Sequence, residues 1–418
     1  MMLPARRSGW CLCSHRCALP PPGDLFNASL LPVPPCVVPL PALALLLAVM
    51  LPYAGLLSLT AVGVWRVRRH SPPAPPDEWP TASVVVPARN EADAIDDCLD
   101  SLRACDYPSG KLEIIVVDDF STDGTGEQVR ARRPAPVGAP VEDPLRLVEM
   151  ETTHASNGRH KPAALAHGID RAEGDIILTT DADCTVSPGW IRSMVRRCTL
   201  ETPFVAGPVA YEHEDRFFPR LQALELMGLV AFGAGTLGVG LPTFCNSANV
   251  AYRRDVLAAR DRAPDGAAQD EILLQYVAYD SDRAVTFNAD REAIVSTDPA
   301  PSFMDYLKQQ ARWAQMGLRY PFQLPRLLVF GLWSGHAALF LAGAVALALP
   351  AWRETVLLTF LGKIAVDALM TVPIVRQFGQ RGLLRSAVPT ELFLLFSVPL
   401  IGLLSTFGDV TWKGRKLD

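Results

Sequence analysis

The chain has 418 residues, enough for two or three domains, but its apolar residues gather in a few long uncharged stretches, which excludes one evenly packed soluble core. With 49% hydrophobic and 20% charged residues, it is too polar for a protein embedded wholly in a membrane and too apolar for an ordinary cytosolic enzyme. The net charge of -5 argues against a nucleic-acid partner, which would require a basic surface facing phosphates.

The cysteines do not predict a secreted disulfide framework, because there are nine of them, an odd number, scattered along the chain. We expect reduced thiols. Cys11, Cys13 and Cys17 lie close in sequence, but no fourth ligand follows at a zinc-site spacing. Residues 1–36 are rich in proline, arginine and cysteine, so we expect a disordered N-terminal extension or an overlong start of the sequence.

A first membrane helix is predicted over residues 37–66. The stretch from Ala42 to Trp65 carries no charge and is long enough to cross a hydrocarbon layer of ~30 Å. No small-residue cleavage signal follows a short apolar core, so we expect an uncleaved anchor rather than a signal peptide. By the positive-inside rule, Arg66, Arg68 and Arg69 place the next domain in the cytoplasm.

Residues 79–300 alternate strand-like and helix-like segments, which is typical of an α/β domain with a mainly parallel sheet. The expected strands are Ala82–Pro87, Leu112–Val117, Leu145–Met150 and Asp175–Thr180, and the expected helices are Glu91–Ala104 and Pro162–Ala172. Two of these strands lead directly into acidic residues, Asp118–Asp119 and Asp181–Asp183. Open α/β sheets bind ligands at the carboxyl ends of their strands, so these carboxylates predict a binding site.

The pair Asp181 and Asp183 flanks one small residue, so that in an extended segment one carboxylate can hold a metal while the other contacts substrate. Taken alone, acidic residues at strand ends are more often turn formers or helix caps. Asp118 and Asp119, followed by Ser, Thr, Asp and Gly, carry the same alternative. The occurrence of both pairs together favours a site.

The C-terminal part repeats the membrane pattern. After an amphipathic interface helix at 301–325, whose pattern runs from Met304 to Leu318, we expect transmembrane helices at 326–352 and 354–376. A further transmembrane or re-entrant helix is expected at 386–408, followed by a tail at 409–418.

Charges near these segments constrain the topology. Arginines between the last two segments predict a cytoplasmic loop, while the basic tail also predicts a cytoplasmic end, and three full crossings cannot satisfy both. One segment is therefore expected to be re-entrant or interfacial. Lys363 and Asp367 share one helix face, so they either pair inside a bundle, which we favour, or lie on an interfacial helix.

Residues 233–238 fit the pattern G-x-G-x-x-G but do not predict a dinucleotide site, because no strand precedes them. We interpret the segment from Phe217 to Leu241 as an apolar, glycine-bearing part of an acceptor side that contacts lipid.

Seven sequence blocks from Ser83 to Trp313 occur in one characteristic order. They are VVVPARNE (84–91), EIIVVDDFSTDGT (113–125), KPAALAHGI (161–169), GDIILTTDADC (174–184), NSANVAYRRDV (246–256), QDEILL (269–274) and the Q-x-x-R-W block (309–313). Together they resemble the GT-A domain of glycosyltransferase family 2, in its membrane-anchored branch with the cellulose, hyaluronan and ceramide glycosyl synthases. The resemblance implies an α/β GT-A domain flanked by transmembrane helices.

The resemblance implies a nucleotide-binding set of residues. Asp119 would bind the nucleobase, with Arg89, Glu91 and Lys161 around the nucleotide. Asp181 would contact the ribose or the sugar.

The resemblance also implies a metal ligand. Asp183 would be the ligand of Mg²⁺ or Mn²⁺ at the diphosphate, since those ions prefer oxygen ligands.

The resemblance also implies catalytic residues. Asp270 would be the base that deprotonates the acceptor hydroxyl in an inverting transfer, although Gln269 departs from the family pattern and leaves Glu271 as the alternative base. Gln309, Arg312 and Trp313 would lie over the site, with Arg312 at the diphosphate and Trp313 at the acceptor. Without the other blocks, their helix would be interpreted as an interfacial anchor.

Three functions follow for comparison. The first is transfer of a sugar from a nucleotide sugar, in particular a UDP-sugar, to a lipid-like acceptor. The second is a processive polysaccharide synthase, which normally needs more crossings than the four segments expected here. The third is an inactive membrane scaffold, disfavoured because every charged site position is present. We expect a multi-pass protein of a bacterial cell membrane with a cytoplasmic catalytic domain.

Overall fold

The structure is a computed structural model that describes residues 40–132, 144–150, 160–212, 216–260, 270–408, 411–412 and 415–416. The predictions for residues 1–36 and the role of Gln269 lie outside the described residues. The five cysteines within the described ranges, Cys98, Cys105, Cys184, Cys198 and Cys245, are all free thiols.

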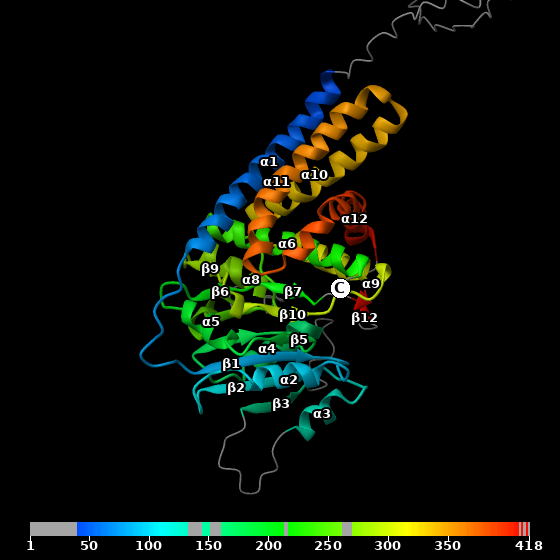
Figure 1. The fold of residues 1–418 in the computed structure, drawn as a ribbon. Coiled ribbons are helices and arrows are strands. Elements are labelled where there is room, and N and C mark those ends of the chain that lie inside the picture. The colour runs from blue at the N-terminus through cyan, green and yellow to red at the C-terminus, as the bar shows by residue number, and fades with distance from the viewer. Residues whose placement is uncertain are drawn as a thin grey trace, which may run out of the picture. The chain divides into compact units, whose positions relative to one another are not determined.

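A seven-stranded sheet forms the centre of the α/β domain, in the order β3-β2-β1-β4-β8-β6-β9 (Figure 1). Its strands are β1 (Ala82–Ala88), β2 (Leu112–Asp118), β3 (Leu145–Glu149), β4 (Ile176–Thr179), β6 (Phe204–Ala206), β8 (Val250–Arg253) and β9 (Val285–Phe287). Strands β3, β2, β1 and β4 are parallel to one another, and β6 is parallel to β9, whereas β8 is antiparallel to both β4 and β6. A second sheet joins β5 (Cys184–Val186), β10 (Val295–Thr297) and β7 (Val209–Tyr211).

The first strands are continuous apolar runs because both faces of a parallel sheet are covered. Val84, Val85 and Val86 of β1 are fully buried, as are the central residues of β2. The covering and connecting helices are α2 (Ile95–Arg103), α3 (Thr125–Ala131), α4 (His160–Ile169), α5 (Trp190–Arg197), α7 (Leu257–Arg260) and α8 (Asp270–Gln275). The mainly parallel α/β fold is therefore confirmed.

Helix α2 begins later than the helix predicted from Glu91. The backbone N–H of Glu91 donates to Thr125 Oγ1 over 2.9 Å, and that of Ala92 donates to Asp123 Oδ2 over 2.9 Å. These bonds to the neighbouring loop hold residues 91–94 in a turn, and the regular helix starts at Ile95. Here hydrogen bonds to a neighbouring loop override the local preference of these residues for a helix.

Five helices within the described ranges are long and apolar enough to cross a membrane. They are α1 (Leu40–Arg69), α6 (Phe217–Gly238), α10 (Gln323–Ala348), α11 (Arg353–Gln377) and α12 (Ala387–Phe407). Four of them correspond to the segments predicted from the sequence, whereas α6 covers the stretch interpreted from the sequence as an apolar, glycine-bearing part of the acceptor side. This helix is apolar all round since it is mostly buried within the protein.

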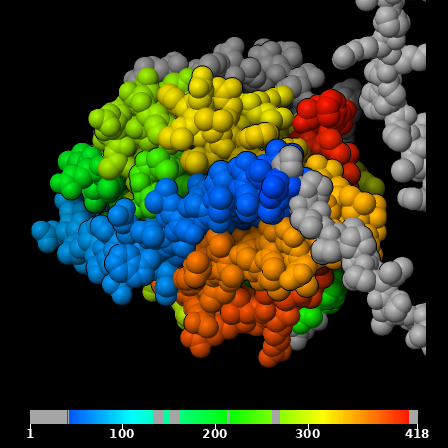
Figure 2. Space-filling model, turned by 90° about the horizontal axis from the view of Figure 1, so that it is seen from above, coloured from blue at the N-terminus to red at the C-terminus, as the bar shows by residue number. Residues whose placement is uncertain are grey.

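The long helices are arranged in two directions. Figure 1 shows α1, α10 and α11 side by side, extending away from the sheets, with α6 between them and the sheets and α12 viewed nearly end-on. Figure 2, seen from above, shows α1 in blue packed against the orange C-terminal helices. The interface helix α9 (Phe303–Leu318) packs against α12, and the two-residue strands β11 (Thr411–Trp412) and β12 (Arg415–Lys416) pair near the C-terminus.

Glycines bring the backbones of α1 and α6 into direct contact. A Cβ atom at Gly63 would lie 1.9 Å from the carbonyl oxygen of Gly235, and a Cβ atom at Gly238 would lie 2.3 Å from the carbonyl oxygen of Gly63. Only residues without a side chain permit this approach. The G-x-G-x-x-G run at 233–238 therefore serves helix packing.

The charged pair in α11 is buried inside the bundle. Lys363 Nζ lies 2.7 Å from Asp367 Oδ2, and it also pairs with Glu391 of α12. Lys363 is only 3% exposed. Of the two alternatives for this pair, the bundle is confirmed and the interfacial helix is wrong.

We predict that Gly63→Ala destabilises the protein by about 1–3 kcal/mol, because the new methyl group overlaps the α6 backbone, which cannot move away without displacing α6. Gly55→Ala is the matched control on the same helix, since nothing lies within 4 Å of its Cβ position. Thermal unfolding of both variants in detergent measures the difference. Equal melting temperatures for the two variants would contradict the close backbone contact.

Candidate active site

The carboxyl ends of β1 and β2 bring Arg89 and Asp119 together. Arg89 Nη1 donates to the carbonyl oxygen of Asp119 over 2.5 Å and lies 3.8 Å from its Oδ2 atom. Both side chains are buried. Glu91 lies two residues beyond Arg89 with a half-buried side chain, so these predicted nucleotide-side residues share one edge of the sheet.

The loops around this edge depend on turn chemistry. The Asp118 Oδ1 atom accepts from the N–H of Ser121 over 3.0 Å, and Asp123 Oδ1 accepts from the N–H of Thr125 over 3.1 Å. Asn90 and Phe120 adopt φ values of 51° and 55°, the left-handed region that is uncommon for residues other than glycine. For Asp118 and Asp123 the turn-forming alternative is thus correct, while Asp119 belongs to the buried cluster with Arg89.

Lys161 and Asp181 form an ion pair beyond the end of β4. The Nζ atom lies 2.6 Å from Oδ1 and 2.7 Å from Oδ2 of Asp181, and 3.5 Å from Ser247 Oγ. Burial alone would lower the pKa of the Lys161 ammonium, but the carboxylate of Asp181 outweighs it and raises the pKa above its usual value. Lys161 therefore stays charged at neutral pH.

Arg312 brings a second positive charge to the same place. Burial lowers the pKa of its guanidinium, and the charges of Asp181 and Asp183 act against that shift. Two carboxylates and two cations thus lie close together just after β4, at the segment Asp181-Ala182-Asp183, which we call the D-x-D segment. A site of this composition can hold an anionic diphosphate through the cations and a divalent ion through the carboxylate oxygens.

Asp181 and Asp183 are the candidate metal ligands of this site. Within the ranges that the structure describes, no three His, Cys, Asp or Glu side chains gather into a metal site. Asp181 and Asp183 supply hard oxygen ligands from one short segment. That set fits Mg²⁺ or Mn²⁺ in the mode in which water and substrate phosphates complete the coordination shell.

Helix α9 holds Gln309, Arg312 and Trp313 beside this site. Gln309 Oε1 accepts a hydrogen bond from Tyr211 of β7 over 3.1 Å, while Arg312 and Trp313 line a cavity next to it. The helix starts at a Ser302 cap, whose Oγ accepts from the N–H of Asp305 over 3.2 Å. Helix α9 thus lies beside the cavity, and the resemblance's assignment of Arg312 to the diphosphate and Trp313 to the acceptor stays a prediction.

Buried polar bonds anchor α9 to α6. Tyr306 donates to Glu225 Oε1 over 2.8 Å, and the Gln222 amide makes two 3.0 Å hydrogen bonds with the backbone of Ala300, just before the helix. Tyr306 and Gln222 are at most 1% exposed. Breaking such bonds leaves unpaired groups in the interior, so α9 has little freedom to move away from the site.

Asp270 is the first residue of α8 and is only 1% exposed. Thr179 Oγ1 lies 3.0 Å from Asp270 Oδ2 and 2.6 Å from the carbonyl oxygen of Ser247. Burial raises the pKa of Asp270 to about 7, although the hydrogen bond with Thr179 and the charge of Lys161 act to lower it. The single hydroxyl proton of Thr179 cannot serve both oxygens at once, which is consistent with a proton on Asp270 near neutral pH.

Glu271 lies next to Asp270 but faces a different partner. Its Oε2 atom accepts a hydrogen bond from Tyr320 over 2.9 Å. Burial raises the pKa of Glu271 to about 7, and the bond with Tyr320 acts to lower it. Two adjacent carboxyl groups therefore titrate near neutral pH, one beside the end of β4 and the other beside the segment that follows α9.

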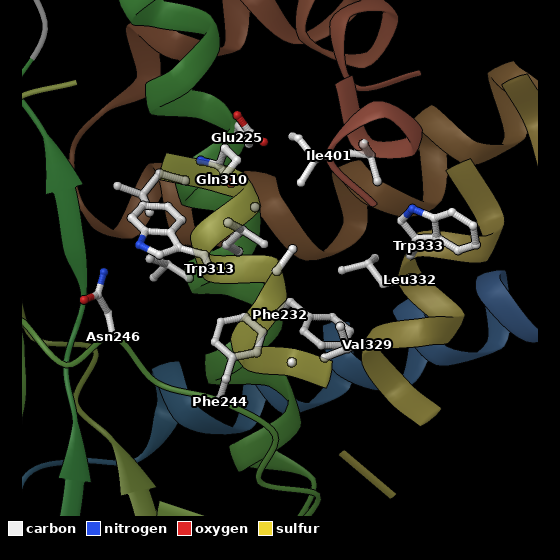
Figure 3. A pocket seen from close by; sticks show the side chains of 18 of the residues that line it. Glu225, Phe232, Phe244, Asn246, Gln310, Trp313, Val329, Leu332, Trp333 and Ile401 are labelled. Carbon is white, nitrogen blue, oxygen red and sulfur yellow. The ribbon is translucent and has the colours of Figure 1, made fainter. Parts of the chain in front are cut away.

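A cavity of about 960 Å³ joins these charged residues to the membrane helices. At one end lie Lys161, Asp270, Glu271, Arg312 and Trp313. Figure 3 shows that the remaining wall carries apolar side chains, among them Phe232, Phe244, Val329, Leu332 and Ile401. The cavity is thus charged at the sheet end and largely apolar between the helices, where a few polar side chains also line it.

Sequence reasoning missed several residues of this site, namely Thr179, Tyr211, Ser247 and Tyr320. Thr179 could have been found from the sequence, because a polar side chain near the end of an otherwise apolar strand indicates a hydrogen-bond partner at the sheet edge. Tyr320 could not have been found from the sequence, since it contacts Glu271 only because the tertiary fold places the segment after α9 beside α8.

Comparison with known proteins agrees with the fold. The profile described as "Glycosyl transferase family 2" matches residues 83–260. Glycosyltransferase AglE of Haloferax volcanii is 25% identical over 269 residues, 61% of this chain and 80% of that protein. An undecaprenyl-phosphate 4-deoxy-4-formamido-L-arabinose transferase of Edwardsiella ictaluri is 30% identical over 151 residues, 35% of this chain and 42% of that protein.

A solved structure shares the GT-A fold. The mannosyltransferase PcManGT from Pyrobaculum calidifontis, in complex with GDP-Man and Mn²⁺, has a TM-score of 0.52 at 23% identity. The match covers 84% of this chain and 99% of that one.

We predict that Asp270→Asn raises the melting temperature at about pH 8 more than at about pH 5. The folded protein retains the Asp270 proton up to about pH 7, whereas the unfolded chain releases it near its ordinary value of ~3.9. The buried carboxylate therefore destabilises the fold increasingly across that window, by at most about 4 kcal/mol. Asparagine carries no charge and escapes the effect.

Asp123→Asn is the comparison variant, for which the change in stability with pH should have the opposite sign. Against the effect of burial, hydrogen bonds from Thr125 and Ala92 lower the pKa of Asp123, so its ionised form stabilises the fold at neutral pH. That variant should lose stability at about pH 8. A melting-temperature difference for Asp270→Asn that does not change with pH would contradict the raised pKa.

Proposed function

Residues 83–260 form a glycosyltransferase family 2 domain and the protein is a glycosyltransferase; on this premise we propose that it transfers a sugar from a nucleotide-sugar donor to the hydroxyl of a lipid-like acceptor. The observation that carries the proposal is the cavity that begins at Lys161, Asp270 and Arg312 and continues between the membrane helices. A UDP-sugar is the proposed donor.

The chemistry of the cavity favours a lipid over a growing polysaccharide. A sugar chain needs hydrogen-bonding partners along its path, because its hydroxyl groups lose water on entering the protein. Here the wall between the helices is largely apolar, with Phe232, Leu332 and Ile401 among its residues. A processive synthase is therefore the weaker alternative. A relative whose name specifies undecaprenyl phosphate gives further support for a lipid acceptor.

The donor nucleotide is assigned to the edge of the sheet. Asp119, held by Arg89, would bind the nucleobase, and Glu91 would lie beside the nucleotide. Lys161 would contact the nucleotide phosphates while orienting Asp181 toward the ribose or sugar. Arg312 would meet the diphosphate, because a guanidinium pairs strongly with phosphate oxygens.

Asp183 would hold Mg²⁺ or Mn²⁺ together with the donor diphosphate. A bound divalent ion neutralises the negative charge that accumulates on the departing diphosphate. The short D-x-D segment after β4 carries this assignment, and the Mn²⁺ in the structure of PcManGT supports it.

Asp270 is the proposed general base. It would accept the proton of the acceptor hydroxyl while that oxygen forms a bond to the anomeric carbon and the bond from this carbon to the diphosphate oxygen breaks. Attack from the face opposite the leaving group inverts the anomeric centre. A pKa of about 7 suits this role, since a base is most effective when its pKa lies near the working pH. Gln309 and Trp313 would position the acceptor.

The membrane assignment completes the proposal. Arg66, Arg68 and Arg69 end α1 and favour a sheet domain on the cytoplasmic side of a bacterial cell membrane. Nucleotide sugars are available on that side. Helix α12, which Figure 1 shows nearly end-on, is the proposed re-entrant or interfacial segment.

The proposal is tested by mass spectrometry of lipids from membranes that contain the protein, supplied with several UDP-sugars and Mn²⁺. We expect one new lipid whose mass exceeds that of an endogenous lipid by one sugar residue, because each transfer adds one sugar to one acceptor. Asp183→Ala membranes are the control and should lack it. A polymer of sugars would instead support the synthase, and no product with any donor would contradict the transferase.

We further predict that Asp270→Asn loses transfer by about 10²-fold to 10⁴-fold, the usual contribution of a positioned base. The amide preserves size and removes basicity, so nucleotide binding should persist. The matched variant is Glu271→Gln, which should retain more activity. The assay follows glycosylation of the acceptor, because hydrolysis of the donor by water does not need an activated acceptor. If Glu271→Gln is the inactive variant, Glu271 is the base.

A further inference from the structure

Polar side chains line the cavity deep among the membrane helices, apart from the charged end at the sheets. They are Tyr53 of α1, His336 of α10, Asp367 of α11 and Thr390 and Glu391 of α12. Polar groups inside a membrane bundle are costly unless they are paired or serve a ligand. Each of these side chains therefore needs a partner.

The charged members of this group satisfy one another. Lys363 pairs with Asp367 over 2.7 Å and also with Glu391, while Tyr53 donates to Asp367 Oδ1 over 2.9 Å. Both oxygens of Asp367 and one oxygen of Glu391 thus already have donors within the protein. This cluster ties α1, α11 and α12 together and does not itself require a charged ligand.

Two polar atoms differ from the charged cluster. His336 Nε2 and Thr390 Oγ1 have no hydrogen-bond partner in the described part of the chain, although both atoms are buried. The two residues are 5% and 2% exposed, and both line the cavity. A buried polar atom without a partner destabilises the protein, because it has lost its hydrogen bonds to water. Such atoms are explained by a ligand that occupies the cavity.

The tautomer of His336 decides whether the ligand must donate or accept a hydrogen bond at Nε2. Its Nδ1 atom lies 3.0 Å from the carbonyl oxygen of Leu332, which can only accept a hydrogen bond, so Nδ1 carries the proton. In the neutral ring, Nε2 is then an acceptor and needs a donor. The ring is held in place edge-on against Tyr53, with centroids 5.8 Å apart. Thr390 offers a hydroxyl, which can donate or accept.

We propose that His336 and Thr390 form a second polar subsite, which binds a hydroxyl group of the lipid in the cavity, remote from the hydroxyl that receives the sugar. This inference rests on the proposed lipid acceptor. A hydroxyl supplies the donor that Nε2 needs and can also serve Thr390. The preferred acceptor is therefore a lipid with two hydroxyl groups separated by an apolar chain, matching a cavity that is polar at both ends and apolar between.

Binding measurements on the full-length protein in detergent test the subsite without requiring glycosyl transfer. The probes are long-chain α,ω-diols and the mono-alcohols with the same carbon chains, over a series of chain lengths. Each competes with a fluorescent fatty alcohol for the cavity. We expect one chain length at which the diol binds about tenfold tighter than its mono-alcohol, because the second hydroxyl satisfies a buried acceptor.

The matched variants separate the subsite from general packing. His336→Phe keeps an aromatic ring against Tyr53, and Thr390→Val keeps the shape of the side chain. Thr359→Val is the control, because the Thr359 hydroxyl bonds to Thr355 of its own helix and does not line the cavity. We expect His336→Phe to abolish the diol preference, Thr390→Val to reduce it and Thr359→Val to leave it unchanged.

The outcomes distinguish this inference from the proposed function. If diol and mono-alcohol bind equally to the wild-type protein, the subsite is wrong while the lipid cavity stands. If neither binds, the lipid acceptor itself is wrong. If a long-chain amino alcohol binds more tightly than the diol, the second polar group of the ligand binds the carboxylates of Asp367 and Glu391, and its assignment to His336 is wrong. Since the preference is a ratio measured within each variant, partial loss of folded protein does not alter it.

Discussion

The backbones of α1 and α6 touch directly, and this contact fixes how the helix bundle is joined to the sheet domain. Gly63 of α1 meets Gly235 and Gly238 of α6 with no side chain between them. Helix α6 also packs against β7 and β9, so one helix joins the membrane anchor to the sheet domain. Because both sides are close-packed, the distance between the bundle and the sheet edge is set by backbone atoms.

That fixed distance makes a single cavity possible. Helices α6, α9, α10, α11 and α12 all contribute to its wall, and its sheet end opens on Lys161, Asp270 and Arg312. Tyr306 and Gln222 hold α9 by buried hydrogen bonds, which keeps Arg312 over the D-x-D segment. Under the proposed function, a water-soluble donor would meet a lipid acceptor in this cavity, the donor entering from the sheet end and the lipid from between the helices.

The site gives the same functional group different properties through its surroundings. The Asp181 carboxylate lies 2.6 Å from the Lys161 ammonium, so a cation balances its negative charge. Asp270 is buried, with Thr179 as its close partner, and its pKa rises to about 7. Environment alone thus separates a carboxylate suited to hold donor or metal from a carboxyl suited to move a proton.

The sequence alone determined the α/β fold class and the positions of β1 to β4, because buried strands and acidic strand ends have local signatures, but not those of the later, shorter strands. It did not reveal α6 as a membrane-length helix, the role of the glycines at 233–238, or Tyr320 beside Glu271. It left open whether Lys363 and Asp367 pair in a bundle. These features depend on helices distant in the chain lying side by side, and only tertiary packing decides which side chains meet there.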